Sequence, residues 1–301
     1  MDMTGERAER ALWRALSAQR DGAGPPRLGA ALRYAVFPGG ARIRPRLTIA
    51  VATALGDPEP RLTDAAAAAI ELIHSASLVH DDLPCFDDAD LRRGRQTLHK
   101  AFDEPTAVLT GDALIVMASQ VLARARSAHP ARVLEMIATL ADASGYPAGI
   151  AAGQAWESEK NVAVGVYHRA KTASLFEAAC ELGALSAGAE PDAVAAWRLV
   201  GEHLGRAYQV ADDLADATSS ASELGKDVGR DHANRRPNTF DRLGVAGSVE
   251  RIERLLLAAA DAIPACAARE AMRRWLLDTS LGVFKLREAP TLEAEEQSRF
   301  G

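Results

Sequence analysis

The sequence predicts an all-α protein, a single helical bundle arranged around a central cavity. Hydrophobic residues make up 48% of the 301 residues and are mostly alanine and leucine, which favour helix, whereas aromatic residues make up only 5%. No alternation of apolar and polar residues typical of strands stands out, and no repeat period is evident. Because no linker long enough to separate two domains interrupts the pattern, we expect residues 1–301 to form one domain.

Glycine and proline divide the apolar pattern into helices. The first break is a loop rich in both residues after position 20, and a second is a Phe-Pro-Gly-Gly turn at residues 37–40. Thr63 is a candidate N-cap for a long helix that carries His74 and ends at an acidic stretch. Charged or polar loops are expected at 84–104 and 217–237. The expected helices are 5–20, a short one ending near 36, 41–55, the long helix after Thr63, 110–126, 131–143, 147–158, 166–187, 191–216, 238–244, 247–263 and 267–285.

Composition argues against several classes of protein. The net charge of −6 argues against a nucleic-acid-binding surface. The N-terminus lacks the apolar core of a signal peptide, and no uncharged apolar run approaches the roughly 20 residues that a membrane span needs. The three cysteines, Cys85, Cys180 and Cys266, show neither disulfide nor metal-ligand spacing. We therefore expect a cytoplasmic protein without a membrane span.

The strongest functional signal is an acidic stretch at residues 80–95, in which five carboxylates are followed by three arginines. On an ideal helix, Asp81 and Asp87 are six residues apart and would not share a face. Pro84 lies between them, and it should end or distort the helix because it lacks a backbone donor and clashes with the preceding turn. The two carboxylates could then reach the same ion.

A second acidic stretch at residues 209–216 places Asp212 and Asp216 on one face of a helix. One acidic cluster could equally be a solvated helix end, but two clusters within apolar helices argue for bound cations. Carboxylate oxygens suit Mg²⁺, which bridges carboxylates to substrate phosphates, and the fork of arginine matches phosphate oxygens. The sequence therefore predicts a magnesium-dependent enzyme acting on diphosphates, with both acidic stretches facing the cavity of the bundle.

Two further features suit a phosphate, although each has a simpler explanation. Arg42 and Arg44 follow a glycine turn at an expected helix start, which fits a phosphate site or an ordinary surface helix. His74 lies two helical turns before Asp81 and is either a ligand contact or a satisfied core histidine.

Together these motifs resemble the trans-polyprenyl diphosphate synthases, and they are most similar to the geranylgeranyl diphosphate synthases of purple bacteria. The resemblance covers nearly the whole chain and implies an isoprenoid-synthase fold. The motifs that carry it are Asp81-Asp82 to Asp87, Arg92-Arg93-Gly94, Gly111-Asp112, Gln154, Lys171-Thr172 and the acidic stretch after Gln209.

The resemblance implies that isopentenyl diphosphate condenses with a C5 to C15 allylic diphosphate, through ionisation, condensation and elimination, to give geranylgeranyl diphosphate. It implies three Mg²⁺ ions held by Asp81, Asp87, Asp212 and Asp216. The catalytic residues it implies are Asp81, Asp82, Lys171, Thr172 and Asp212. The substrate-binding residues it implies are Gly40, Arg44, His74, Arg92, Arg93, Lys171, Thr172, Gln209, Lys226 and Arg235.

Two features bear on substrate affinity and product length. Ala41 stands where most members of the resembled family carry a lysine that contacts isopentenyl diphosphate, and Arg42 is a candidate to compensate. Ala76 and Ser77 are small where bacterial farnesyl synthases tend to place an aromatic residue, which leaves room for a C20 product. The floor of the tunnel could instead come from a facing helix, at residues such as Ile115 or Met117.

Three alternatives stay open. A farnesyl diphosphate synthase would share the chemistry and stop at C15. A catalytically silent subunit of a heteromeric synthase would be expected to have eroded acidic motifs, and only Ala41 favours it. A class I terpene cyclase would be expected to have a different second metal motif and more aromatic residues. Relatives form homodimers, and the apolar helix at 110–126 is a candidate interface.

Overall fold

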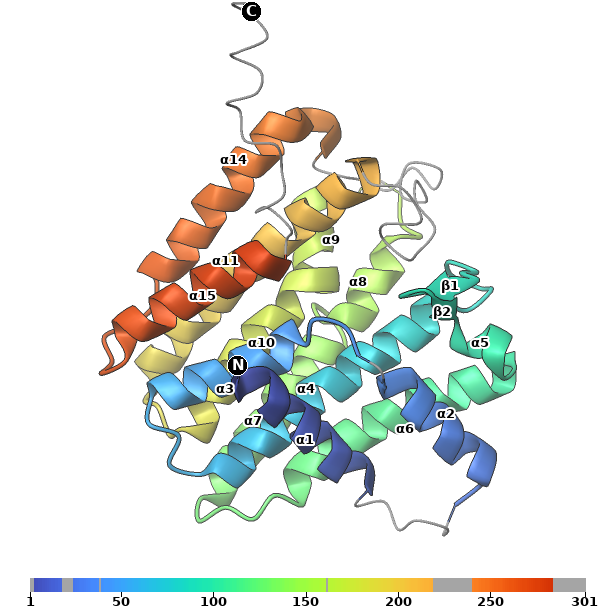
Figure 1. The fold of residues 1–301 in the computed structure, drawn as a ribbon, viewed down its shortest axis with the longest axis horizontal. Coiled ribbons are helices and arrows are strands. Elements are labelled where there is room, and N and C mark those ends of the chain that lie inside the picture. Colours follow the sequence, from blue (N-terminus) through green and yellow to red (C-terminus); the bar gives the residue numbers. More distant parts are fainter. Residues whose placement is uncertain (1–2, 18–23, 38, 161, 219–239, 284–301) are drawn as a thin grey trace, which may run out of the picture.

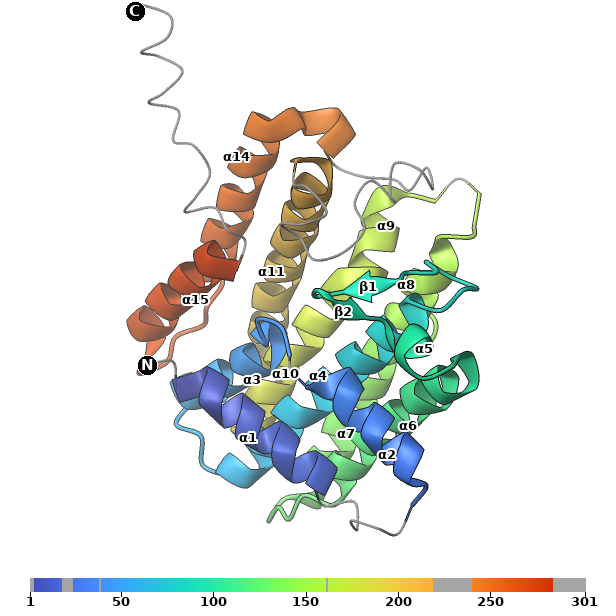
Figure 2. The same cartoon turned by 45° about the vertical axis from the view of Figure 1, so that its right-hand side comes forward.

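The structure is a computed structural model that describes residues 3–17, 24–37, 39–160, 162–218 and 240–283. It confirms the all-α prediction, because helices dominate the fold and pack side by side as a bundle (Figures 1 and 2). The elements are α1 (Met3–Ser17), α2 (Pro26–Val36), α3 (Ile43–Ala54), α4 (Pro60–Asp81), β1 (Leu91–Arg92), β2 (Arg95–Gln96), α5 (Leu98–Ala101), α6 (Glu104–Ala123), α7 (Pro130–Ser144), α8 (Ile150–Trp156), α9 (Val164–His168), the π-helical turn η1 (Arg169–Ala173), α10 (Ser174–Ser186), α11 (Pro191–Thr218), α14 (Phe240–Asp261) and α15 (Arg269–Val283).

The centre of the bundle is α4, which packs against α1, α3, α6, α7 and α10. Its alanine-rich sequence lets the neighbouring helices approach closely, and Ile70 and Leu72 are fully buried in the core. Thr63 is not the N-cap of this helix, which begins three residues earlier at Pro60. Its hydroxyl is buried in the first turn and donates to Asp57 Oδ1 at 2.6 Å, so it satisfies a side chain rather than the helix end.

The region expected to be a loop, 84–104, contains short regular elements. The strands β1 and β2 pair antiparallel, with Leu91 opposite Gln96, and Arg93 and Gly94 turn the chain with φ values of 54° and 72°. Strands of two residues are too short to produce an alternating pattern, which is why the sequence did not reveal them. The next long helix, α6, begins at Glu104 rather than 110 because Asp103 caps it, accepting from the Thr106 amide at 2.7 Å.

The helix expected at 166–187 has an irregular start. It is built from α9, η1 and α10 in direct succession, so that a π-helical turn lies within an otherwise continuous helical segment. The two helices expected at 238–244 and 247–263 correspond to α14, which is kinked at Gly244, where φ is 62°. The loop expected at 217–237 and the chain after Val283 lie almost entirely outside the described residues.

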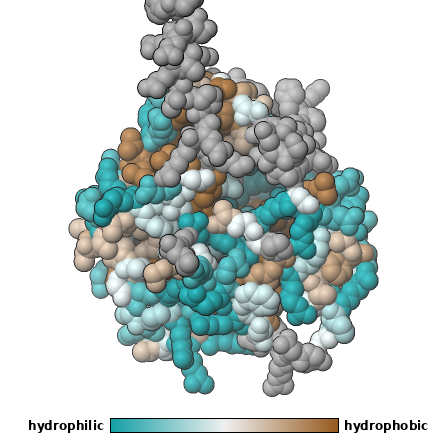
Figure 3. Space-filling view, in the orientation of Figure 1, coloured by the Kyte–Doolittle hydropathy of each residue, from teal (hydrophilic) through white to brown (hydrophobic). Residues whose placement is uncertain are grey.

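The surface seen in Figure 3 is mainly hydrophilic, with apolar side chains in small groups. Two helices, α4 and α6, are long and apolar enough to cross a membrane by length and composition alone. Of the apolar stretch in α4, 78% is buried inside the bundle, which accounts for its composition by packing. In α6 the buried share is 44%, so part of its apolar surface faces outward.

Candidate active site

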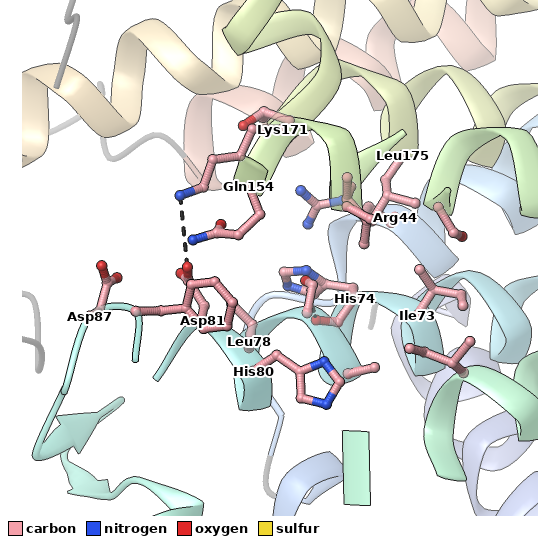
Figure 4. A pocket seen from close by; sticks show the side chains of 18 of the residues that line it. Arg44, Ile73, His74, Leu78, His80, Asp81, Asp87, Gln154, Lys171 and Leu175 are labelled. Atoms are coloured by element: carbon pink, nitrogen blue, oxygen red, sulfur yellow. Dashed lines mark hydrogen bonds and ion pairs between the residues drawn. The ribbon is translucent and has the colours of Figure 1, made fainter. Parts of the chain in front are cut away.

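A pocket of about 820 Å³ runs through the bundle and is lined by residues from α4, α6, α7, α8, η1, α10 and α11 (Figure 4). Both acidic stretches contribute to its walls: Asp81 and Asp87 from one, Asp212 and Asp216 from the other. In Figure 4, Asp81, Asp87 and Lys171 lie towards one end, whereas Ile73 and Leu175 lie towards the other, with Arg44 and His74 between them. The pocket therefore has a charged end and an apolar end.

The end of α4 brings the first acidic pair together. As Pro84 predicts, the helix ends before the proline, at Asp81, and the chain then turns back. The amide of Asp87 donates to the backbone carbonyl of Asp81 at 2.9 Å, which closes a loop around the proline. Ligand oxygens of Asp81, Asp87 and Glu157 all lie within 4.8 Å of one another. A helix continued through residue 87 would have separated the pair.

The environment of Asp81 suits a divalent cation. Burial raises the pKa of its carboxyl group, and the nearby acids Asp87 and Glu157 raise the pKa further, although Lys171 and Arg92 partly offset this. The atom Asp81 Oδ1 is buried without a hydrogen bond, and Lys171 Nζ lies 3.8 Å away. Asp81 therefore offers a buried oxygen that lacks a hydrogen bond, and two further carboxylates, those of Asp87 and Glu157, lie beside it. Carboxylate oxygens are the ligands that Mg²⁺ prefers.

Asp82 points away from the pocket and has a different setting from its neighbour. It is 4% exposed and does not line the pocket. Its carboxylate accepts from Arg92 Nε at 2.8 Å and lies 2.7 Å from Arg92 Nη2, a bidentate pair. Arg92 does line the pocket, and its Nη2 lies 3.8 Å from Asp81 Oδ2. Asp82 therefore orients Arg92 and does not itself line the pocket.

Glu157 is a site residue that the sequence analysis did not identify. Its side chain is 9% exposed, and it accepts hydrogen bonds from Lys171 Nζ, from the Tyr167 hydroxyl at 2.7 Å and from Gln154 Nε2 at 3.1 Å. Glu157 thus joins the carboxylates of Asp81 and Asp87 to η1 and α8. The available signal was its position three residues after Gln154, one helical turn along, but it lies outside both acidic stretches.

The π-helical turn carries Lys171 and Thr172, and both residues line the pocket. The Thr172 hydroxyl donates to Gln209 Oε1, and Gln209 Nε2 in turn donates to Asp213 Oδ1 at 2.8 Å. This chain of hydrogen bonds connects η1 to the second acidic stretch on α11. The Thr172 oxygen is therefore held in a fixed position on the pocket wall.

Glycines on both sides hold the π-helical turn in place. A Cβ atom added to Gly153 of α8 would lie 2.4 Å from Lys171 Cα, and one added to Gly205 of α11 would lie 2.5 Å from Ala173 Cα. Contacts that short with backbone atoms cannot be relieved by a side-chain rotation. The turn is therefore clamped between two helices that must stay close to it.

We expect Gly153→Ala to displace the turn and to reduce turnover by about 100-fold, because misplacing reacting groups by about 1 Å has an effect of this size. The overpacking should also destabilise the fold by roughly 1–3 kcal/mol. Gly165→Ala is the matched control, since a Cβ at Gly165 has no neighbour within 4 Å. Steady-state kinetics and thermal unfolding of both variants test whether the close approach of Gly153 holds the π-helical turn in place. Equal activity in Gly153→Ala and Gly165→Ala would exclude this role.

Arg44 and His74 lie between the charged and apolar ends of the pocket. Arg44 is 6% exposed, its Nε has no hydrogen-bond partner, and its guanidinium lies over the Phe176 ring at 4.6 Å and the Tyr208 ring at 5.6 Å. Burial lowers the pKa of Arg44. Burial, together with Arg44 and other nearby arginines, lowers the pKa of His74 well below 6.5, so its imidazole is neutral at pH 7.

The glycine turn before α3 holds two further arginines. A Cβ added to Gly40 would lie 2.7 Å from Arg93 Cζ, so the Arg93 guanidinium rests against this glycine, outside the lining of the pocket. Arg42 is 5% exposed and donates to Glu9 and Glu71, each at 2.7 Å. The expectation that Arg42 compensates for Ala41 is therefore wrong, because its guanidinium is committed to buried ion pairs.

The remaining candidates divide between pocket and surroundings. Ala76, Ser77 and Ile115 line the pocket, whereas Met117 is 6% exposed and does not. Lys226 and Arg235 lie outside the described residues.

An all-α bundle with acidic groups and cations at one end of a pocket, and aliphatic side chains at the other, defines an enzyme class acting on diphosphates with apolar chains. The family described as polyprenyl synthetase matches residues 25–241, and the chain belongs to this family.

Individual proteins are similar over most of the chain. A geranylgeranyl diphosphate synthase of Cereibacter sphaeroides is 51% identical over 261 residues, which cover 87% of this chain and 90% of the relative. The geranyltransferase of Legionella pneumophila superposes with a TM-score of 0.79 at 29% identity and covers 95% of this chain and 96% of that one. The Helicobacter pylori geranyltransferase complexed with magnesium and isoprenyl diphosphate has a TM-score of 0.77 at 29% identity, over 92% of this chain and 97% of that one.

Proposed function

We propose that the protein condenses isopentenyl diphosphate with allylic diphosphates of up to C15 and gives geranylgeranyl diphosphate. The observation that carries this proposal is one pocket with Asp81, Asp87, Asp212 and Asp216 at its charged end and an aliphatic extension beyond Arg44. A diphosphate fits the first part and a growing hydrocarbon the second. The 51% identity to a geranylgeranyl diphosphate synthase supports the same assignment.

Four aspartates, Asp81 and Asp87 on one wall and Asp212 and Asp216 on the other, would hold Mg²⁺, with three ions expected per site when substrate is bound. Bound Mg²⁺ would supply charge neutralisation of the departing diphosphate. The buried Oδ1 of Asp81, which forms no hydrogen bond, and its proximity to Asp87 and Glu157 support this fit.

The cations of the chain would complete the binding of the allylic diphosphate. Arg92 is oriented by Asp82, and Lys171 by Glu157, so both are preorganised on the pocket wall. Gln209, Lys226 and Arg235 are proposed further contacts to the same diphosphate. Thr172 would direct its oxygen dipole at the allylic cation once the carbon–oxygen bond to diphosphate has broken.

Isopentenyl diphosphate would occupy the neighbouring site formed by Arg44, His74, Arg93 and the glycine turn at Gly40. The double bond of this substrate attacks the allylic cation and forms the new carbon–carbon bond. A proton is then lost from the adjacent carbon, and the departed diphosphate, held by the cations, accepts it. Because His74 is neutral at pH 7, it can donate one hydrogen bond to a phosphate oxygen without adding charge.

A product assay tests the proposal. The purified protein is given Mg²⁺ and isopentenyl diphosphate with C5, C10 or C15 allylic diphosphate in separate reactions. A C20 product is expected from each primer. A product that stops at C15 would favour a farnesyl diphosphate synthase, and no condensation with any primer would favour the silent subunit.

We further propose that the enzyme works in the cytoplasm as a homodimer, with 1–301 as one domain and α6 at the interface. The outward face of α6 exposes Val108, Leu109 and Val116 at 41%, 56% and 57%, a row of apolar side chains that water solvates poorly. A helix with such a face packs favourably against its own copy, because each buried apolar side chain contributes roughly 1.5–3 kcal/mol.

We expect Leu109→Glu to shift the protein from dimer to monomer, because it places a charge in the middle of this face. Leu257→Glu, at a residue 50% exposed on α14, is the control and should leave the dimer intact. Sedimentation velocity measures the mass of each variant. A monomeric unsubstituted protein, or a dimeric Leu109→Glu variant, would exclude this interface.

A further inference from the structure

We infer that Arg95 and Tyr34 form a bridge that aligns the two substrate sites with each other. The inference rests on the proposed function, because it concerns how the site for isopentenyl diphosphate is held together. Neither residue lines the pocket, so both act by positioning other groups. Arg95 belongs to β2 of the hairpin formed by β1 and β2, and Tyr34 belongs to α2, which leads into the glycine turn.

The base of the hairpin is fixed to the acidic loop that precedes it. The hydroxyl of Thr97, which follows β2, is buried and donates to the Ala89 carbonyl at 2.6 Å, and the Thr97 amide donates to the Asp90 carbonyl at 3.0 Å. Ala89 is joined in turn to the end of α4, because its amide donates to the Asp82 carbonyl at 3.2 Å. The hairpin is therefore attached to the charged end of the pocket, where the allylic diphosphate would bind.

The glycine turn is anchored to different elements. The Phe37 ring at its start stacks on Trp13 of α1, with ring centroids 4.5 Å apart. At the end of the turn, Arg42 donates to Glu9 of α1 and to Glu71 of α4, each at 2.7 Å. These contacts hold the turn against α1 and α4, and neither of them involves the hairpin. Hairpin and turn thus have separate anchors.

Arg95 crosses from the hairpin to the glycine turn. Its Nη1 donates to the Phe37 carbonyl at 3.0 Å, and its guanidinium lies 4.0 Å from the centroid of the Tyr34 ring, a cation–π contact. The Tyr34 hydroxyl donates to the carbonyl of Gln96, the next residue of β2, at 2.8 Å. The hairpin and α2 lie close together on one side of the bundle (Figures 1 and 2). Tyr34 therefore holds both the backbone of the hairpin and the side chain of Arg95.

The bridge keeps Arg93 beside Gly40, and both residues belong to the proposed site for isopentenyl diphosphate. Arg93 lies in the turn between β1 and β2, and a Cβ added to Gly40 would lie 2.7 Å from Arg93 Cζ. Arg93 has a φ of 54°, a left-handed conformation that is unfavourable for a residue with a side chain, so it needs support from the surrounding structure. Arg95 supplies this support, because it ties the strand after the turn to Phe37, three residues before Gly40.

Arg95→Met is expected to raise the KM for isopentenyl diphosphate about tenfold, because a hydrogen bond and a cation–π contact that hold the hairpin to the glycine turn are lost. The change in kcat should be smaller. The KM for a C15 allylic diphosphate should stay the same, because the bonds of Thr97 and the pair of Asp82 with Arg92 remain. A general loss of structure would instead affect both substrates.

Three further variants separate the bridge from other effects. Arg95→Lys keeps a cation and a donor on a long side chain, so it should recover most of the affinity for isopentenyl diphosphate. Tyr34→Phe keeps the ring but loses the bond to Gln96, so it should raise the same KM about threefold. Arg33→Met is the matched control, because Arg33 is an exposed arginine of α2 whose guanidinium forms no hydrogen bond or ion pair with the residues that the structure describes.

Initial rates are measured with Mg²⁺ while one substrate is varied and the other is saturating, and thermal unfolding verifies that each variant is folded. A rise confined to the KM for isopentenyl diphosphate in Arg95→Met, and absent in Arg33→Met, supports the bridge. An unchanged KM in Arg95→Met overturns it, as does an equal rise for both substrates. If Arg95→Met does not fold, the same comparison in Tyr34→Phe decides. Failure of the unsubstituted protein to condense any primer would instead overturn the proposed function, so the two failures are distinguishable.

Discussion

Replacing Asp81 or Asp212 with asparagine is expected to reduce turnover by on the order of 10³-fold, because each change removes a charge that would help neutralise the departing diphosphate. Asparagine keeps the size of the side chain, so the pocket retains its shape. Steady-state rates with Mg²⁺, isopentenyl diphosphate and a C15 primer measure the effect. Full turnover in either variant would place the metal site elsewhere in the protein.

The stability of the Asp81→Asn variant should change in the opposite direction. The raised pKa of Asp81 means that its ionised form is less favourable in the folded than in the unfolded protein, and this cost is present at pH values above the folded pKa. The Tm without Mg²⁺ should therefore stay equal or rise at pH 7. The increase in Tm on adding Mg²⁺ with inorganic diphosphate should disappear.

Asp88→Asn is the matched control for this experiment. Asp88 belongs to the same acidic stretch, but its side chain is 61% exposed, lies 3.7 Å from Lys100 Nζ and does not line the pocket. Asparagine also tolerates the positive φ of 44° at this position. Normal turnover in Asp88→Asn would show that the loss in Asp81→Asn reflects position in the pocket and not the charge of the loop.

Arg44→Met is expected to raise the KM for isopentenyl diphosphate on the order of 100-fold with a smaller change in kcat, because a buried charged contact to the substrate is lost. The same variant should be more stable without ligand. No hydrogen bond or ion pair joins the Arg44 guanidinium group to another residue in the described ranges, and an uncompensated buried charge costs several kcal/mol. Losing the cation–π contacts with Phe176 and Tyr208 offsets about 1–2 kcal/mol of the stability that is gained by removing this charge.

Thermal unfolding and substrate titration separate the two effects. A net gain of about 1 kcal/mol should raise the Tm by roughly 2 °C in a protein of this size. Arg61→Met, at an exposed arginine on α4, is the control and should change neither quantity. A lower Tm in Arg44→Met would show that the guanidinium stabilises the ligand-free fold, and an unchanged KM would remove Arg44 from the substrate site.

The sequence allowed much of the fold to be predicted, because helical periodicity and helix breaks are local properties of the chain. Pro84 correctly indicated the end of α4, since the loss of a backbone donor acts on the residues beside it. The boundaries that failed depended on longer contacts. Thr63 is a typical capping residue, yet its hydroxyl donates to Asp57, and nothing local distinguishes these two uses.

The site was predictable in its charge but not in its side-chain orientations. Adjacent Asp81 and Asp82 are alike in the sequence, yet only the former lines the pocket, because the end of the helix turns the latter towards Arg92. Arg42 looked available for substrate, but Glu9 and Glu71 approach it from distant positions in the chain. Glu157 became visible only when folding brought it beside Lys171.

The π-helical turn at Arg169–Ala173 also bears on how this active site can change over generations. Such a turn holds one residue more than an α-helical turn, as a helix does after a single-codon insertion. Deleting one residue there would restore a regular helix, but it would rotate the two flanks by about 100° relative to each other. Tyr167 and Thr172 would no longer both face the pocket. The length of this segment is therefore constrained as well as the identity of its pocket-lining residues.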